Sequence, residues 1–228
     1  MRFEELLANR TELPPERFEN TSRWADVLPT QEVSVLGYGK YGFAFDLHDG
    51  RVLKITSDDS EARTSLFLLN KEHKNVAKIL KIAKYKSQTV VGQYFIIMKK
   101  YKENDLDENF FDAALEELDV ERASGYPRAT TKDYWKIPKD EHELYNRLRP
   151  ALDPNSSHSS QVTLKFVKVL LDIRAGLEYL KKNNIVFKDA HYANILMDDA
   201  GNYVISDLGN HSISRASEYD IPLLEVLI

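Results

Sequence analysis

The chain has 228 residues, of which 43% are hydrophobic and 29% are charged, a composition that supports a sizeable core and excludes a disordered protein. Its 31 Lys and Arg against 36 Asp and Glu give a net charge of −5, so no overall positive charge favours nucleic acid or an anionic membrane. There is no cysteine, which excludes disulfides, Cys-ligated zinc and a thiol nucleophile and suits the cytoplasm.

The N-terminal arm, residues 1–30, does not have the pattern of a secretory signal peptide. Glu4 and Glu5 stand where a secretory signal would need basic and then apolar residues. The best apolar run, residues 164–180, is interrupted by five charged residues and is typical of an amphipathic helix. We therefore expect a soluble cytoplasmic protein without a nucleic-acid or membrane partner. A short helix is predicted at Phe3–Asn9.

Residues 31–101 are rich in predicted strands. Alternating apolar residues flank the turn Asp49-Gly50, which is a strong hairpin signal. A helix follows the capping residues Asp58, Asp59 and Ser60, and a second hairpin completes a five-stranded antiparallel sheet with one helix. The predicted strands are residues 33–36, 43–47, 51–56, 76–86 and 89–98, and the helix is 61–70.

The stretch from residue 102 to 161 is polar and punctuated by prolines, with a helical pattern around residues 109–121. It is typical of a hinge that carries an insertion. Residues 162–228 then begin with a long helix and continue into a short hairpin. The helix is predicted at 162–183, and the hairpin strands at 195–197 and 203–205.

Gly37, Gly39 and Gly42 form a glycine run between the first two predicted strands. Glycines let a backbone approach nucleotide phosphates closely, because no side chain intervenes. The residues after Gly42 alternate like a strand, so no helix N-terminus is available for the pyrophosphate of a dinucleotide. Taken alone, a glycine-rich hairpin without a ligand is an equally good interpretation.

Lys54 lies in the third predicted strand among apolar neighbours. It either extends to solvent or points beneath the glycine run, where it would contact α- and β-phosphates and need a carboxylate to position it. Glu61 is the best candidate for that carboxylate, and Glu72 is the alternative. Either glutamate alone is more typical of a solvated helix face.

Two acidic motifs lie near the end of the chain. Asp189 is followed five positions later by Asn194, and Asp207 comes two residues after the end of the predicted hairpin. This arrangement is suited to holding two magnesium ions against a nucleoside triphosphate. The alternative, a capped turn between helix and strand, does not account for the spacing of the second Asp.

The order of these motifs resembles the protein kinase superfamily over roughly residues 31–210. The resemblance implies an α+β, bilobal fold, with ATP and Mg²⁺ as cofactors. It also implies that Asp189 accepts the proton of the acceptor hydroxyl, while Asn194 and Asp207 hold magnesium. The nucleotide would be bound by Gly37, Gly39, Gly42, Ala44, Lys54 with its partner Glu61, and Met98, which ends the strand lining the adenine pocket.

The chain departs from the kinase pattern at several positions. Phe187 and Lys188 replace the His and Arg before the catalytic Asp, and Leu208 replaces the Phe of the metal motif. His191 stands where Ser/Thr protein kinases often have lysine. A titratable ring at this place occurs in relatives that phosphorylate antibiotics, although a structural hydrogen bond is the plainer interpretation.

Only residues 210–228 follow the metal motif, and they contain no Ala-Pro-Glu sequence. We therefore expect a reduced C-lobe, residues 162–228, in which the apolar residues 223–228 pack against the rest. Such minimal chains are similar to kinases that some bacteriophages encode.

Three functions stay open at this point. The first is a Ser/Thr protein kinase that modifies a protein substrate, itself included. The second is a small-molecule kinase of the antibiotic-phosphorylating type. The third is a kinase-fold binding module that contacts a protein partner through residues 102–161 or the apolar C-terminus.

Overall fold

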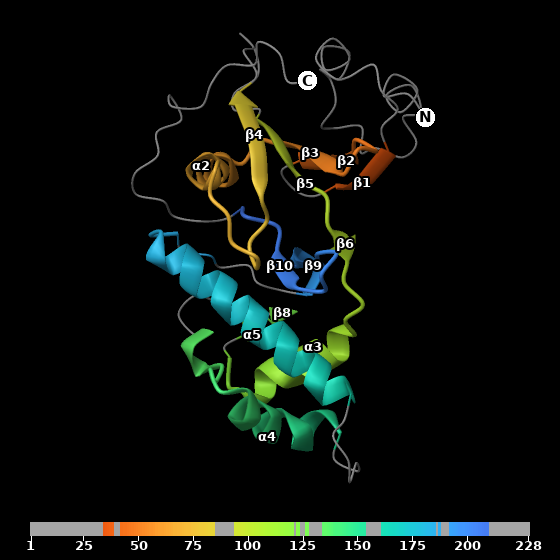
Figure 1. The fold of residues 1–228 in the computed structure, drawn as a ribbon, viewed down its shortest axis with the longest axis vertical. Helices are drawn as coiled ribbons and strands as arrows, with labels where there is room; N and C mark the ends of the chain where they lie inside the picture. Colours follow the sequence, from red (N-terminus) through yellow and green to blue (C-terminus); the bar gives the residue numbers. More distant parts are fainter. Residues whose placement is uncertain are drawn as a thin grey trace. The chain divides into compact units, whose positions relative to one another are not determined.

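The computed structural model describes residues 34–38, 42–84, 94–120, 122–123, 126–127, 134–153, 161–185, 187 and 192–209. These residues fall into two compact units (Figure 1). The first combines an antiparallel sheet with a helix and the second is mainly helical with short strands, so the predicted α+β class is confirmed. Of the described residues, the first unit takes those up to 70 and from 79 to 100, and the second takes 71–78 and those from 101 onward. The predicted helix at Phe3–Asn9 and the apolar residues 223–228 lie outside the described residues.

The first unit is built on the predicted five-stranded antiparallel sheet, whose strand order is β1-β2-β3-β5-β4. The turn between β2 and β3 contains Gly50, as predicted, in a left-handed conformation with φ 85°. His48 is also left-handed, with φ 58°, which the sequence did not indicate. The strand β5 is nearly all buried, as a strand between two neighbours should be. The strands are β1 Ser34–Tyr38, β2 Gly42–Asp46, β3 Arg51–Thr56, β4 Ile79–Lys84 and β5 Tyr94–Lys99.

The helix α2, Asp59–Leu68, packs against β4 and β5. It begins two residues earlier than predicted because Asp58 caps it, accepting hydrogen bonds from the backbone N–H groups of Ser60 at 2.8 Å and Glu61 at 3.4 Å. This cap fixes where the first turn of α2 lies, and Glu61 belongs to that turn.

The predicted strand beginning at Val76 is wrong in its first three residues, because β4 begins at Ile79. Residues 71–78 belong to the second unit, where Val76 forms a parallel bridge with Ile205. The backbone N–H of Ala77 donates to the Ile205 oxygen at 2.9 Å, and the N–H of Ile205 donates to the Asn75 oxygen at 3.0 Å. The backbone groups of this segment are thus satisfied outside the sheet that the sequence pattern suggested.

The helix α5 is the longest element of the second unit and appears in cyan in Figure 1. Its buried residues recur at helical spacing, as for Phe166, Leu170, Ile173, Leu177 and Leu180. One side packs against α4, which also packs against α3, and another packs against β10. The bounds are β6 Lys102–Glu103, α3 Glu108–Glu117, β7 Arg122–Ala123, β8 Tyr126–Pro127, η3 Tyr134–Lys136, α4 Glu141–Leu152, α5 Gln161–Lys182, η4 Tyr192–Asn194, β9 Ile195–Met197 and β10 Tyr203–Ile205.

The helix α4 was not anticipated from the sequence. Asp140 caps it by accepting a hydrogen bond from the N–H of Glu143 at 2.7 Å. Leu144, Leu148 and Leu152 form its buried face at a spacing of four residues. Pro150 obscured this pattern, since a proline inside a helix removes one backbone hydrogen bond and clashes with the preceding turn. Here the helix ends two residues after it, at Leu152.

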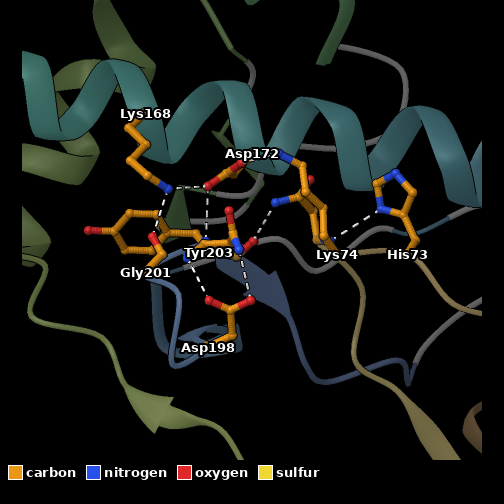
Figure 2. A network of polar contacts seen from close by, with 9 residues as sticks. His73, Lys74, Lys168, Asp172, Asp198, Gly201 and Tyr203 are labelled. Carbon is orange, nitrogen blue, oxygen red and sulfur yellow. Dashed lines mark hydrogen bonds and ion pairs between the residues drawn. The ribbon is translucent and has the colours of Figure 1, made fainter.

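Asp172 on α5 anchors three parts of the second unit (Figure 2). Its carboxylate accepts hydrogen bonds from Lys168 Nζ at 2.8 Å and from the N–H of Tyr203 at 3.0 Å, and it lies 3.8 Å from Lys74 Nζ. The buried side chain of Asn75 donates to the Tyr203 oxygen at 2.9 Å. These contacts tie α5, β10 and residues 71–78 together.

His73 belongs to the same segment and stacks on Tyr179 of α5, with the ring centroids 4.5 Å apart. Burial lowers the pKa of His73, and the charges of Lys74 and Lys182 lower it further, while Asp172 opposes this change. The neutral imidazole suits this place, because its Nδ1 accepts a hydrogen bond from the backbone N–H of residue 75 at 3.3 Å.

The described part of the chain contains no helix with the length and apolar character that crossing a membrane requires.

Candidate active site

Lys54 and Glu61 form an ion pair in the first unit, with 2.5 Å between Lys54 Nζ and Glu61 Oε1. The side chain of Glu61 is 6% exposed and that of Lys54 is 20% exposed. Glu72, the alternative partner, instead pairs with Lys78 in the second unit. The choice that the sequence left open is therefore settled in favour of Glu61.

The sheet register explains where this pair lies. Lys54 is opposite Ala44 on β2 and opposite Ile96 on β5, and Met98 comes two residues after Ile96. Paired residues and residues two apart share a face of a sheet. Ala44, Lys54 and Met98 thus lie on one face, and Glu61 reaches that face from the first turn of α2.

Different physical constraints apply at the positions of the glycine run. A Cβ on Gly42 would lie 1.9 Å from the backbone oxygen of Ile55, so glycine is needed there for β2 to approach β3. A Cβ on Gly37 would meet no atom within 4 Å. Packing therefore explains Gly42 without any ligand but does not explain Gly37. Gly39 lies outside the described residues.

The hairpin of β9 and β10 brings the two candidate metal-binding segments together in the second unit. Its strands are those predicted, and its last pair is Ile195 with Ile205. Asn194 and Ser206 directly flank this pair, and the Asn194 oxygen accepts hydrogen bonds from the Ser206 N–H at 2.9 Å and from Ser206 Oγ at 3.0 Å. Asp207 is the next residue along the chain, so both candidate ligands lie on adjoining backbone segments.

The comparison with known families agrees with this arrangement. A family model described as protein tyrosine and serine/threonine kinase matches residues 54–221. The match covers well over half of the chain. The chain belongs to the protein kinase family. A search of the curated proteins found no match.

As a protein kinase, the chain is a phosphotransferase. The family match begins at Lys54 and includes Glu61, Asp189, Asn194 and Asp207. The glycine run, Gly37, Gly39 and Gly42, lies before the matched residues. Asp189 and His191 fall outside the residues that the structure describes.

The donor atoms of this kinase suit magnesium. Asn194 offers an amide oxygen and Asp207 a carboxylate, and hard oxygen ligands are those that Mg²⁺ prefers. Within the described part of the chain, no group of three or more His, Cys, Asp or Glu residues is placed to hold a metal by itself. A pair of protein ligands is typical of Mg²⁺ that is bound together with phosphates and water.

Asp207 also takes part in a tight turn, in which its Oδ1 accepts a hydrogen bond from the N–H of Gly209 at 3.2 Å. Leu208 between them is 1% exposed, and Phe187, just before the catalytic motif, is fully buried. Leu208 and Phe187, two of the departures from the kinase pattern, therefore occupy apolar packing positions.

Asn104 contacts the segment that carries the candidate metal ligand Asn194, and the sequence did not single it out. Its side-chain amide donates to the backbone oxygens of Tyr192, at 2.8 Å, and of Ile195. No local pattern could have identified Asn104, because the two partners are far away in the sequence. The contact depends on the pairing of β6 with β9.

Proposed function

We propose that this kinase uses ATP and Mg²⁺ to phosphorylate Ser and Thr hydroxyls of proteins, itself included. The observation that carries the proposal is the ion pair of Lys54 with Glu61 at 2.5 Å. A buried carboxylate is costly to keep charged without a partner. Its presence beside a lysine, on the sheet face shared with Ala44 and Met98, supports a site for nucleotide phosphates.

In the first unit, Lys54 supplies a positive charge for the α- and β-phosphates, and Glu61 holds its ammonium in place. Met98 and Ala44 present apolar surface to the adenine ring. Gly37 and Gly39 allow the backbone to approach the phosphates.

In the second unit, Asp189 orients the acceptor hydroxyl and accepts its proton as the oxygen bonds to the γ-phosphorus and ADP leaves. Asn194 and Asp207 present oxygen ligands. Magnesium, when bound with ATP, neutralises the phosphate charge. These residues act by positioning and electrostatics, which are the main contributions to catalysis of phosphoryl transfer.

We propose separately that the molecule accepting the phosphoryl group is a protein. The family match is to protein kinases, which supports a protein substrate. The substrate would contact residues 102–161 or the apolar C-terminus, both of which follow the N-lobe, residues 31–101, in the sequence. His191 favours the second candidate, a kinase of small hydroxylated molecules.

The proposal is tested by incubating the purified chain with Mg²⁺ and γ-labelled ATP, alone, with a cell lysate and with a panel of hydroxylated small molecules. We expect label on protein, recovered as phosphoserine or phosphothreonine. Lys54→Met should reduce the rate at least about 100-fold. Lys81→Met, the same change at an exposed residue of the same sheet, is the matched control and should leave the rate unchanged.

Other results would reject the proposal. Label found only on a small molecule would establish the second candidate. Nucleotide binding without transfer to any acceptor would establish a kinase-fold binding module.

A further inference from the structure

The backbone around Asn194 is held by side chains from both sides. The Asn104 amide nitrogen donates to the oxygen of Tyr192 at 2.8 Å and to the oxygen of Ile195. Ser206 Oγ donates to the oxygen of Asn194 at 3.0 Å. Three carbonyl groups within four consecutive residues are therefore fixed by two side chains.

The direction of the Asn104 amide follows from its partners. Backbone carbonyls only accept hydrogen bonds, so the amide nitrogen must face Tyr192 and Ile195. The amide oxygen faces the other way and accepts a hydrogen bond from the N–H of Leu106 at 2.8 Å. Asn104 thus joins the start of the segment leading to α3 to the loop that carries Asn194.

Contacts from outside this segment contribute to the position of Asn194. The helix η4 has only three residues, Tyr192–Asn194, too few for a series of internal helical hydrogen bonds. The Ser206 N–H also donates to the Asn194 oxygen at 2.9 Å. The Asn104 and Ser206 side chains add to this backbone contact.

Strand pairing fixes where Asn104 lies. Lys102 and Glu103 of β6 pair with Met197 and Leu196 of β9, so the next residue along, Asn104, comes opposite the start of β9. Ser206 is placed in the same way by β10, which pairs with the other side of β9. Both side chains are thus set by one small three-stranded sheet.

We propose that Asn104 and Ser206 are positioning residues that set Asn194 for magnesium coordination, an inference that rests on the proposed function. Magnesium demands near-ideal octahedral geometry with ligand distances of about 2.0–2.1 Å. A ligand that moves by about half an ångström no longer fits this geometry. Loss of a hydrogen bond that orients a metal ligand typically lowers the affinity for the metal about 10- to 100-fold.

Asn104→Asp separates positioning from folding. The aspartate keeps the volume and the acceptor for Leu106, but it replaces the donor by an oxygen that repels the carbonyls of Tyr192 and Ile195. Ser206→Ala removes one donor and keeps the backbone hydrogen bond to Asn194. Ser206→Thr restores the hydroxyl, and Asn109→Asp is the matched control at an exposed residue of α3.

The experiment measures Mn²⁺ binding by electron paramagnetic resonance in the presence of a non-hydrolysable ATP analogue, together with the Mg²⁺ dependence of kcat. We expect Asn104→Asp to raise the Mn²⁺ dissociation constant about 10-fold and Ser206→Ala to raise it by a smaller factor. Ser206→Thr and Asn109→Asp should match the unchanged chain. Affinity for the nucleotide measured without metal should stay the same in all variants.

A merely structural role would lower the melting temperature and leave metal affinity unchanged, and this result would overturn the inference. Ser206→Ala gives the answer on its own if Asn104→Asp does not fold. Metal binding by the unchanged chain distinguishes a failure of the proposed function from a failure of the positioning role of Asn104 and Ser206. If that chain does not bind Mn²⁺ with the nucleotide, the proposed function fails and the inference with it, whereas normal binding in every variant rejects the inference alone.

Discussion

Gly176→Ala should destabilise the second unit, although alanine is the better helix former. Gly176 lies in α5 where residues 71–78 cross it. A Cβ there would come within 2.7 Å of the Asn75 backbone oxygen and within 2.9 Å of Ile205 Cδ1. Contacts this short force one of the neighbours to move.

Two opposing terms set the size of the effect. Replacing a glycine inside a helix by alanine stabilises by about 1 kcal/mol. Overpacking a filled site costs about 1–3 kcal/mol. The Asn75 oxygen accepts a hydrogen bond from Ile205 at 3.0 Å, and the Asn75 side chain is bonded to Tyr203 at 2.9 Å, so this backbone does not shift freely. We therefore expect a net loss of about 1 kcal/mol in the free energy of unfolding.

The assay is urea unfolding followed by circular dichroism, with a double-mutant cycle. Ile205→Val removes Cδ1 and alone should cost about 0.5–1.5 kcal/mol. In the Gly176→Ala background it should cost less, because it also relieves one of the two clashes. Gly37→Ala, where a Cβ meets nothing within 4 Å, is the control. A more stable Gly176→Ala variant with no coupling to Ile205 would refute the steric reasoning.

Three further predictions concern single residues. Gly42→Ala should destabilise the first unit by more than about 1 kcal/mol in urea unfolding, because the added Cβ would lie 1.9 Å from the Ile55 oxygen; an unchanged midpoint would contradict this. Glu61→Gln should slow phosphoryl transfer about 10- to 100-fold because Lys54 loses the carboxylate 2.5 Å away, and an unaltered rate would show that the pair has no part in transfer. The pKa of His73 lies below its ordinary value of 6.5, so the unfolded chain binds a proton more readily and stability should fall as pH drops through 6.5 toward the lowered pKa. His73→Phe should lose less stability than the unchanged chain between pH 7.5 and 5.5, and equal losses would rule out this linkage.

Local signals predicted part of the fold with correct boundaries. The hairpin strands 195–197 and 203–205 and the strand Arg51–Thr56 are as expected, because each is bounded by a turn whose glycine takes a positive φ, Gly201 in one case and Gly50 in the other. The pairing of Lys54 with Glu61 was anticipated as the better of two choices. The structure shows this pairing. The cap at Asp58 starts α2 at Asp59 and so places Glu61 in the first turn.

Other features depend on contacts that no local pattern encodes. Val76 has the apolar character of a strand residue, yet it pairs with Ile205 in the second unit. Asn104 resembles any polar loop residue until β6 pairs with β9. The four-residue spacing of leucines in α4 was readable in principle, but Pro150 argued against a helix.

The most direct test of the account is the initial rate of transfer from γ-labelled ATP by the unchanged chain, by Asp189→Asn and by Asp207→Ala. Asp199→Ala, at an exposed residue of the turn between β9 and β10, is the control for the second change. We expect measurable transfer that falls at least about 100-fold in both site variants and persists in the control. Transfer that continues at the full rate without Asp189 or Asp207 would contradict the proposed mechanism, because Asp189 is assigned to the hydroxyl proton and Asp207, together with Asn194, to the metal.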